Sequence, residues 1–162
     1  MGERSINLIY GGGGLGLMGV LAKDLKSYGV KVTGVIPELL YHLVKEVESD
    51  EDELIVVPNM HERKAEMYER ADAFIVLPGG IGTLEEFLEV FTWLQLGYHH
   101  KPIGILNSGG YYNKLLSFLE ESVATGFLKE AMYKTLVVSQ EAESLIEELK
   151  KVEIKVPLKI DL

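Results

Sequence analysis

Residues 78–86 place glycines and carboxylates where they could bind and cleave a phosphorylated compound. They read Pro-Gly-Gly-Ile-Gly-Thr-Leu-Glu-Glu and follow an apolar run at 73–77. A strand that leads through a Gly-rich turn into a helix presents unpaired backbone N–H groups, and the helix dipole also favours an anion there. Glu85 and Glu86 would stand one turn further on. We therefore expect a phosphate cradle beside a carboxylate, which suits chemistry on a phosphorylated sugar or nucleotide.

The same residues also have a purely structural interpretation. Thr83-Leu84-Glu85-Glu86 fits the capping-box pattern, with Thr83 as the N-cap and Glu86 returning to its amide. Taken alone, the segment favours neither interpretation. Glu86 adjoins Phe87 at the edge of the expected apolar stripe, so it is better placed than Glu85 to face a pocket.

A second Gly-rich segment, at residues 10–19, contains a formal G-x-G-x-x-G at Gly14, Gly16 and Gly19. A dinucleotide fingerprint needs an acid at the end of the next strand. That strand instead reads Val-Thr-Gly-Val-Ile-Pro, and no Gly-Lys-Ser/Thr of a Walker loop follows the glycines. We expect a generic mononucleotide or phosphate turn, and tight strand–helix packing is the competing interpretation.

A third segment, Asn-Met-His-Glu-Arg-Lys-Ala-Glu-Met, starts at Asn59 and predicts a capped helix. Arg63 or Lys64 would share a face with the methionines and interrupt an apolar stripe. A buried cation demands an anion. An internal ion pair with Glu86 or Glu89 is the favoured interpretation of this segment alone, and binding of a substrate phosphate or ribose is the functional one.

Composition bounds the class of protein. The chain has 162 residues, 47% of them apolar, and a formal charge of −9 from 25 acids and 16 bases. An acidic balance disfavours nucleic acid as a partner. The absence of cysteine excludes disulfides and thiolate metal sites, and the four histidines have no ligand spacing, so no metal is expected. The acidic run at 46–53 predicts a solvated loop.

No apolar run is long enough to span a membrane, and the start Met-Gly-Glu-Arg-Ser-Ile resembles neither a signal peptide nor a myristoylation site. We therefore expect a cytoplasmic protein with no membrane partner.

Apolar runs alternate with helical periodicity along the chain. The expected strands cover residues 6–10, 30–36, 54–57, 73–77, 102–106 and 135–138. The expected helices cover residues 17–27, 60–70, 84–96, 111–125 and 140–150. This alternation predicts an α/β fold, a doubly wound parallel sheet with helices on both faces (Rossmann-like), in a single domain of residues 1–150. Residues 151–162 would form a tail, and ligands would bind at the carboxyl ends of the strands.

Together, the three segments resemble the LONELY GUY family of cytokinin-activating enzymes. Further similarity at 92–97, 101–104 and 110–113 extends the resemblance over roughly residues 6–150. The resemblance implies a homodimeric phosphoribohydrolase that needs no cofactor. Such enzymes cleave the N-glycosidic bond of nucleoside 5′-monophosphates, and they release a base and ribose 5-phosphate.

The resemblance places the catalytic residues at Arg63 and Glu86. The implied substrate-binding residues are Gly12, Gly13, Gly14, Met60, Lys64, Gly79, Gly80, Gly82, Thr83, Glu85 and Thr92. A substrate-contacting acid of the family aligns loosely with Glu46. The family's older label, lysine decarboxylase, would require a Schiff-base lysine, and the sequence singles out none for that role.

These roles agree with glycoside chemistry. An oxocarbenium-like state can be stabilised by the Glu86 carboxylate while it orients or deprotonates water, and Arg63 can hold the substrate and offset developing charge. AMP or a cytokinin riboside monophosphate is the expected substrate. Family members also begin with a further strand, a Cys-Gly-Ser-type turn and a helix, which this chain is expected to lack. For that reason a module that binds a nucleotide or pterin-type cofactor without cleaving it, or an inert remnant, remains an alternative.

Overall fold

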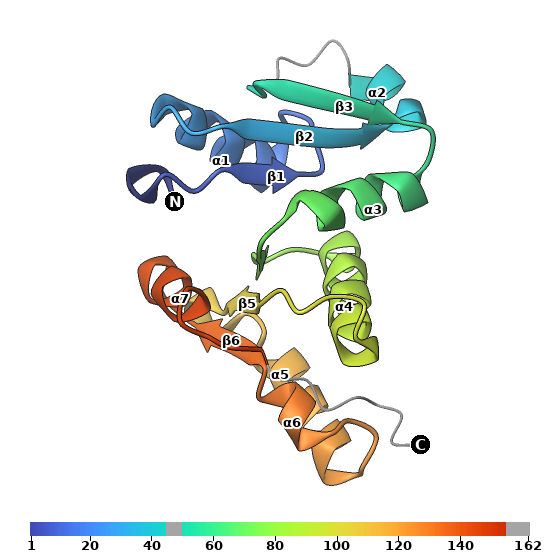
Figure 1. Cartoon of the computed structure of the whole chain (residues 1–162), viewed down its shortest axis with the longest axis vertical. Coiled ribbons are helices and arrows are strands. Elements are labelled where there is room, and N and C mark those ends of the chain that lie inside the picture. Colours follow the sequence, from blue (N-terminus) through green and yellow to red (C-terminus); the bar gives the residue numbers. More distant parts are fainter. Residues whose placement is uncertain (45–49, 155–162) are drawn as a thin grey trace. The chain divides into compact units, whose positions relative to one another are not determined.

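The computed structural model describes residues 1–44 and 50–154. The chain divides into two compact units, residues 1–71 and 72–162. Each unit contains a three-stranded parallel sheet with helices connecting its strands (Figure 1).

The first unit is built on the sheet β1-β2-β3. Its strands are β1 (Leu8–Tyr10), β2 (Val32–Pro37) and β3 (Glu53–Val57). Its helices are the 3-10 helix η1 (Gly2–Arg4), α1 (Gly16–Ser27), α2 (Glu38–Val44) and α3 (Met60–Arg70). The central strand β2 is buried along its whole length, as expected for a parallel strand covered on both faces. Its residue Gly34 lies opposite Tyr10 in the register with β1.

One hydrophobic cluster of the first unit lies between α1 and the strands. It consists of Leu8, Tyr10, Ala22, Leu25, Val30 and Val32. The buried stripe of α1 includes the small residues Gly19 and Ala22. A Cβ on Gly19 would clash with the carbonyl oxygen of Gly14. The third glycine of the G-x-G-x-x-G pattern is therefore required by close packing of the helix on the turn that precedes it.

The second unit is built on the sheet β4-β5-β6. Its strands are β4 (Phe74–Val76), β5 (Ile103–Leu106) and β6 (Leu136–Ser139). Its helices are α4 (Ile81–Leu96), the 3-10 helix η2 (Ser108–Gly110), α5 (Asn113–Ala124), α6 (Glu130–Tyr133) and α7 (Ala142–Leu149). Helix α7 packs on β5 and β6. A Cβ on Gly104 of β5 would lie 2.8 Å from Leu149 Cδ1, so this glycine lets the helix approach the sheet closely.

The parallel α/β fold expected from the sequence is confirmed. All six expected strands and all five expected helices form, and α3 has the expected bounds. The strands of the described residues are distributed over two sheets, with β1 and β4 each at an edge. Helices α2 and α6 were not expected, because segments this short carry little periodicity. The single domain of residues 1–150 and the tail stay predictions, and residues 155–162 of that tail lie outside the described part.

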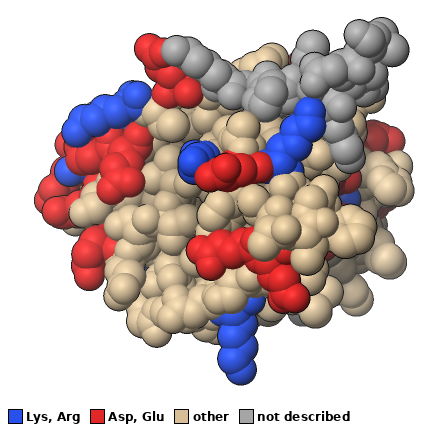
Figure 2. Space-filling view, turned by 90° about the horizontal axis from the view of Figure 1, so that it is seen from below, with Lys and Arg blue, Asp and Glu red and all other residues tan. Residues whose placement is uncertain are grey.

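No helix in the described ranges is long and apolar enough to cross a membrane. Those ranges also contain no group of three or more histidines and carboxylates that could hold a metal ion. On the face drawn in Figure 2, the lysine and arginine side chains of the described residues lie among acidic ones and form no continuous basic surface.

His99, which follows α4, is partly buried and has a lowered pKa. Its Nδ1 accepts the Lys101 N–H (3.1 Å), so Nε2 carries the proton and donates to the Val90 carbonyl (2.8 Å). Burial, with a smaller contribution from Lys101 and His100, lowers the pKa of His99 below its ordinary value.

A pH dependence of stability follows from this lowered pKa. The unfolded state takes up a proton near pH 6.5 before the folded state does, so stability is present above that pH and is lost as the pH falls through the lower pKa of the folded state. We expect the melting temperature to drop between pH 7.5 and 5.5, and to drop less in His99→Gln. Equal drops in the two proteins would contradict this account.

Candidate active site

The loop between β4 and α4 lies at the carboxyl end of a parallel strand, where such sheets bind ligands. Helix α4 begins at Ile81 with Gly80 as its N-cap, and its first intrahelical bond runs from Leu84 N to Gly80 O (3.1 Å). Gly80 has no side chain with which to cap the first amides of the helix. These amides have no partner within the helix, so the start of α4 is suited to an anion.

The capping box expected at Thr83 is wrong. Thr83 lies inside the first turn of α4, and its side chain packs against Gly79, where a Cβ would clash with Thr83 Oγ1. The helix starts three residues earlier because the chain is still extended at Gly80 (φ −93°, ψ −154°) and turns helical directly after it. By contrast, α3 is capped as expected, since Asn59 Oδ1 accepts the Glu62 N–H (3.0 Å).

The two neighbouring carboxylates Glu85 and Glu86 on α4 differ in exposure as the sequence predicts: Glu86 is half-buried and Glu85 is exposed. Both lie in the second turn rather than the first, because α4 starts at Ile81. At 1.5 Å per residue, Glu86 stands about 9 Å along the axis from Gly80. That separation leaves room for a ribose between a bound phosphate and the carboxylate.

Helical spacing predicts an apolar face of α4 at residues 84, 87, 88, 91 and 94, and the observed face differs in part. Its buried residues are Phe87, Val90, Phe91 and Leu94, whereas Leu88 is exposed. Thr92 is exposed and donates its hydroxyl to the Leu88 carbonyl (2.7 Å). It stands roughly 18 Å along the axis from Gly80, so it could contact only a part of a substrate far from the phosphate.

In the first unit, Arg63 is held at the carboxyl ends of β1 and β2. Its Nε donates to the Val35 carbonyl (3.1 Å), and its Nη1 lies 3.3 Å from Met60 Sδ. The guanidinium lies directly over Gly11, where a Cβ would clash with Arg63 Nη2. Because Nε already donates to a backbone carbonyl, the Nη groups are the ones that would bind a substrate. Their forked geometry matches phosphate or carboxylate.

Lys64 is the buried cation of α3. Its exposed fraction is 6%, and it shares the buried face with Tyr68 one turn on. The sequence instead suggested a face shared with Met60 and Met67, but Met60 is 42% exposed. The buried face of α3 is therefore rotated from the expected one.

Glu51 belongs to the acidic run that was expected to form a solvated loop, but it is half-buried and lies against the Gly-rich turn after β1. Its Oε1 accepts the Gly13 N–H (2.9 Å) and the Tyr10 hydroxyl. Burial and the neighbouring Glu51 carboxylate raise the pKa of Tyr10, so the phenol stays a donor. The Glu51 carboxylate on the Gly13 amide disfavours binding of an anion at Gly13 and favours a hydroxyl or amino group of a ligand.

Substrate contact by Gly12, Gly13 and Gly14 stays a prediction, and Glu46 lies outside the described residues.

Tyr111 and Tyr112 also have a position that the sequence did not reveal. The sequence treats them as core or interface aromatics, and Tyr112 is indeed buried, but their hydroxyls donate to the carbonyls of Gly79 (2.9 Å) and Leu77 (2.6 Å). One signal could have identified them. They follow β5, the neighbour of β4, and residues after the carboxyl ends of neighbouring parallel strands lie close together.

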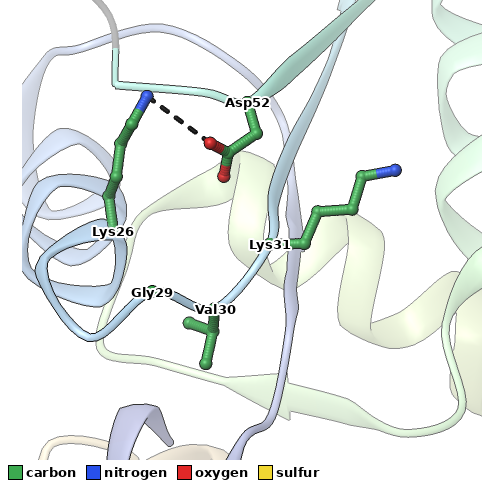
Figure 3. A pocket seen from close by; sticks show the side chains of 5 residues that line it. All are labelled: Lys26, Gly29, Val30, Lys31 and Asp52. Atoms are coloured by element: carbon green, nitrogen blue, oxygen red, sulfur yellow. Dashed lines mark ion pairs between the residues drawn. The ribbon is translucent and has the colours of Figure 1, made fainter.

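A pocket in the first unit, shown in Figure 3, is not a candidate site. It is lined by Lys26, Gly29, Val30, Lys31 and Asp52. These residues precede β2 and β3, so the pocket lies at the amino ends of the strands. Its basic groups are already paired: Lys26 Nζ lies 3.7 Å from Asp52 Oδ1, and Lys31 Nζ lies 2.6 Å from Glu53 Oε2.

The candidate residues therefore form two groups. Arg63, Met60, Lys64 and the Gly-rich turn belong to the first unit, and the 79–86 segment with Thr92 belongs to the second. That Arg63 and Glu86 act on one substrate stays a prediction. The fold and the position of both groups after parallel strands define a Rossmann-like α/β protein with a glycine-rich loop at a helix start.

Comparison with known proteins identifies the family. Residues 18–149 match a family described as "Possible lysine decarboxylase". Cytokinin riboside 5′-monophosphate phosphoribohydrolase LOG7 of Arabidopsis thaliana is 47% identical over 152 residues, which are 93% of this chain and 69% of that protein. Probable cytokinin riboside 5′-monophosphate phosphoribohydrolase LOGL3 of Oryza sativa subsp. japonica is 48% identical over 147 residues, 90% of this chain and 69% of that protein.

The chain belongs to this LONELY GUY family, as the resemblance of its three segments suggested. It spans 69% of the length of each of these two relatives.

Proposed function

We propose that the chain hydrolyses the N-glycosidic bond of a purine nucleoside 5′-monophosphate and releases the free base and ribose 5-phosphate. The observation that carries this proposal is the start of α4, where amides suited to a phosphate precede the half-buried Glu86 carboxylate by about 9 Å of helix. The names of relatives that are 47–48% identical support the same reaction.

In the proposed reaction the substrate phosphate binds the amides of Gly80, Ile81 and Gly82. The bond from C1′ to the base nitrogen breaks with oxocarbenium character. Glu86 stabilises that charge and takes a proton from the attacking water, whose oxygen becomes the C1 hydroxyl of ribose 5-phosphate. The departing base takes up a proton.

Arg63 supplies the second half of the site. Its guanidinium, anchored on Val35, binds the substrate and offsets negative charge on the departing base or on the phosphate. We include in the proposal a homodimer whose partner helps to complete the site, with AMP or a cytokinin riboside monophosphate as the substrate.

The phosphate requirement distinguishes this proposal from its alternatives. The purified protein is incubated with AMP, with isopentenyladenosine monophosphate and with adenosine, and free base is followed by chromatography. We expect release of base from at least one monophosphate. Release from adenosine should be at least about a hundredfold less, because adenosine has no phosphate to bind the amides at the start of α4. Binding of the monophosphates without any release would indicate a nucleotide-binding module instead. Equal release from AMP and adenosine would contradict the role of the loop.

A further inference from the structure

The loop that would hold the phosphate contains few side chains that could fix its conformation. The glycine loop, residues 77–80, contains Gly79 and Gly80 in sequence, and glycine adopts many backbone conformations at similar energy. Pro78 fixes one φ angle but carries no N–H. An amide that has to point at a phosphate from such a loop must be oriented by contacts from elsewhere in the fold.

The tyrosine pair, Tyr111 and Tyr112, supplies those contacts. The hydroxyl of Tyr111 donates to the Gly79 carbonyl (2.9 Å), and the hydroxyl of Tyr112 donates to the Leu77 carbonyl (2.6 Å). A peptide group is planar, with its C=O and its N–H pointing in opposite directions. Holding the Gly79 carbonyl toward Tyr111 therefore turns the Gly80 N–H away from the tyrosine.

The tyrosine pair is itself anchored to the sheet. Asn107, which follows β5 and is 6% exposed, accepts the Tyr112 N–H at Oδ1 (2.7 Å). Its own N–H donates to the carbonyl of Ser139 at the end of β6 (2.8 Å), and its Nδ2 donates to Asn113 Oδ1 (2.8 Å). The two rings contact each other edge to face, with centroids 4.9 Å apart. The loop after β4 is thus held by residues that are fixed to the ends of β5 and β6.

We propose that Tyr111 and Tyr112 are positioning residues for phosphate recognition, which hold the glycine loop in the conformation that presents its amides to the substrate phosphate. The inference rests on the proposed function, since it assigns a role within the same site. It predicts that loss of either hydroxyl weakens binding of the phosphate and leaves binding of the nucleoside part unchanged.

The test compares Tyr111→Phe and Tyr112→Phe with Tyr133→Phe. Tyr133 is the matched control, because its hydroxyl makes one hydrogen bond, to Glu120 Oε1 (2.9 Å), in the same unit and away from the loop. Titration calorimetry with ribose 5-phosphate is expected to show binding weakened about tenfold in each of the first two variants and unchanged in the control. KM for AMP should rise by a similar factor, whereas kcat and inhibition by adenosine change by less than about threefold.

Ribose 5-phosphate affinities of Tyr111→Phe and Tyr112→Phe equal to that of Tyr133→Phe would overturn the proposal, as would an equal loss for adenosine. Tyr111 is 58% exposed, so its variant is expected to fold even if Tyr112→Phe does not. A wild-type protein that binds ribose 5-phosphate but releases no base refutes the proposed hydrolysis, and the titrations still decide the role of the tyrosine pair. A wild-type protein that does not bind ribose 5-phosphate refutes the role of the tyrosine pair, whereas hydrolysis is still decided by release of base from AMP.

Discussion

Glu86→Gln is expected to lower kcat for AMP about a thousandfold, because an amide can neither take a proton from water nor stabilise a positive charge at C1′. Gln has nearly the size of Glu, so binding of ribose 5-phosphate at the start of α4 should change by less than about threefold. The expected signature is a loss of kcat with KM nearly unchanged, measured from initial rates of base release.

The matched control for this variant is Glu89→Gln, which removes a half-buried carboxylate from the same helix one turn further on. Its kcat is expected to stay within about threefold of wild type. If both variants lose activity equally, the effect comes from the charge of α4 as a whole and not from a carboxylate at the reacting carbon. If Glu86→Gln keeps its activity, the catalytic role of Glu86 is wrong.

Gly11→Ala is expected to lower kcat/KM about a hundredfold although the substitution adds only a methyl group. A Cβ at this position would clash with Arg63 Nη2, so the guanidinium has to leave its place beside Val35. A misplacement of about 1 Å in a positioning group can cost this much. Overpacking should also lower the free energy of unfolding by about 1–3 kcal/mol.

A double-mutant cycle with Arg63→Ala tests the cause. If Gly11→Ala acts by displacing the guanidinium, its destabilisation should largely disappear once Arg63 is truncated, giving a coupling free energy of about 1 kcal/mol or more in denaturant unfolding. The same destabilisation in both backgrounds would show that a side chain at position 11 is unfavourable for a local reason and not because it displaces Arg63.

Local patterns were sufficient to predict the elements of the fold. Periodicity located every strand and the long helices, and the Asn59 cap fixed the start of α3. The relative exposure of Glu85 and Glu86 also followed from their spacing to Phe87. These features depend on neighbours within a few residues, and sequence patterns report such neighbours directly.

Contacts between distant residues could not be predicted in this way. Glu51 reaches Gly13 across 38 residues, and Tyr111 reaches Gly79 across 32. Both depend on which strands become neighbours. The start of α4 was misplaced because Thr83 fits a capping box equally well, and only the extended backbone of Gly80 decides against it. The burial of Lys64 likewise depends on how α3 is rotated against its sheet.

The most direct test of the central claim is the mass balance of a long incubation with AMP. Purified protein is mixed with at least a hundredfold excess of AMP, and AMP, adenine and ribose 5-phosphate are quantified over time, with Glu86→Gln and Arg63→Ala as parallel samples. We expect wild type to convert AMP over many turnovers into equal amounts of adenine and ribose 5-phosphate, and both variants to yield almost none. Unchanged AMP with wild-type protein, or adenine released equally by all three proteins, would contradict hydrolysis by Arg63 and Glu86.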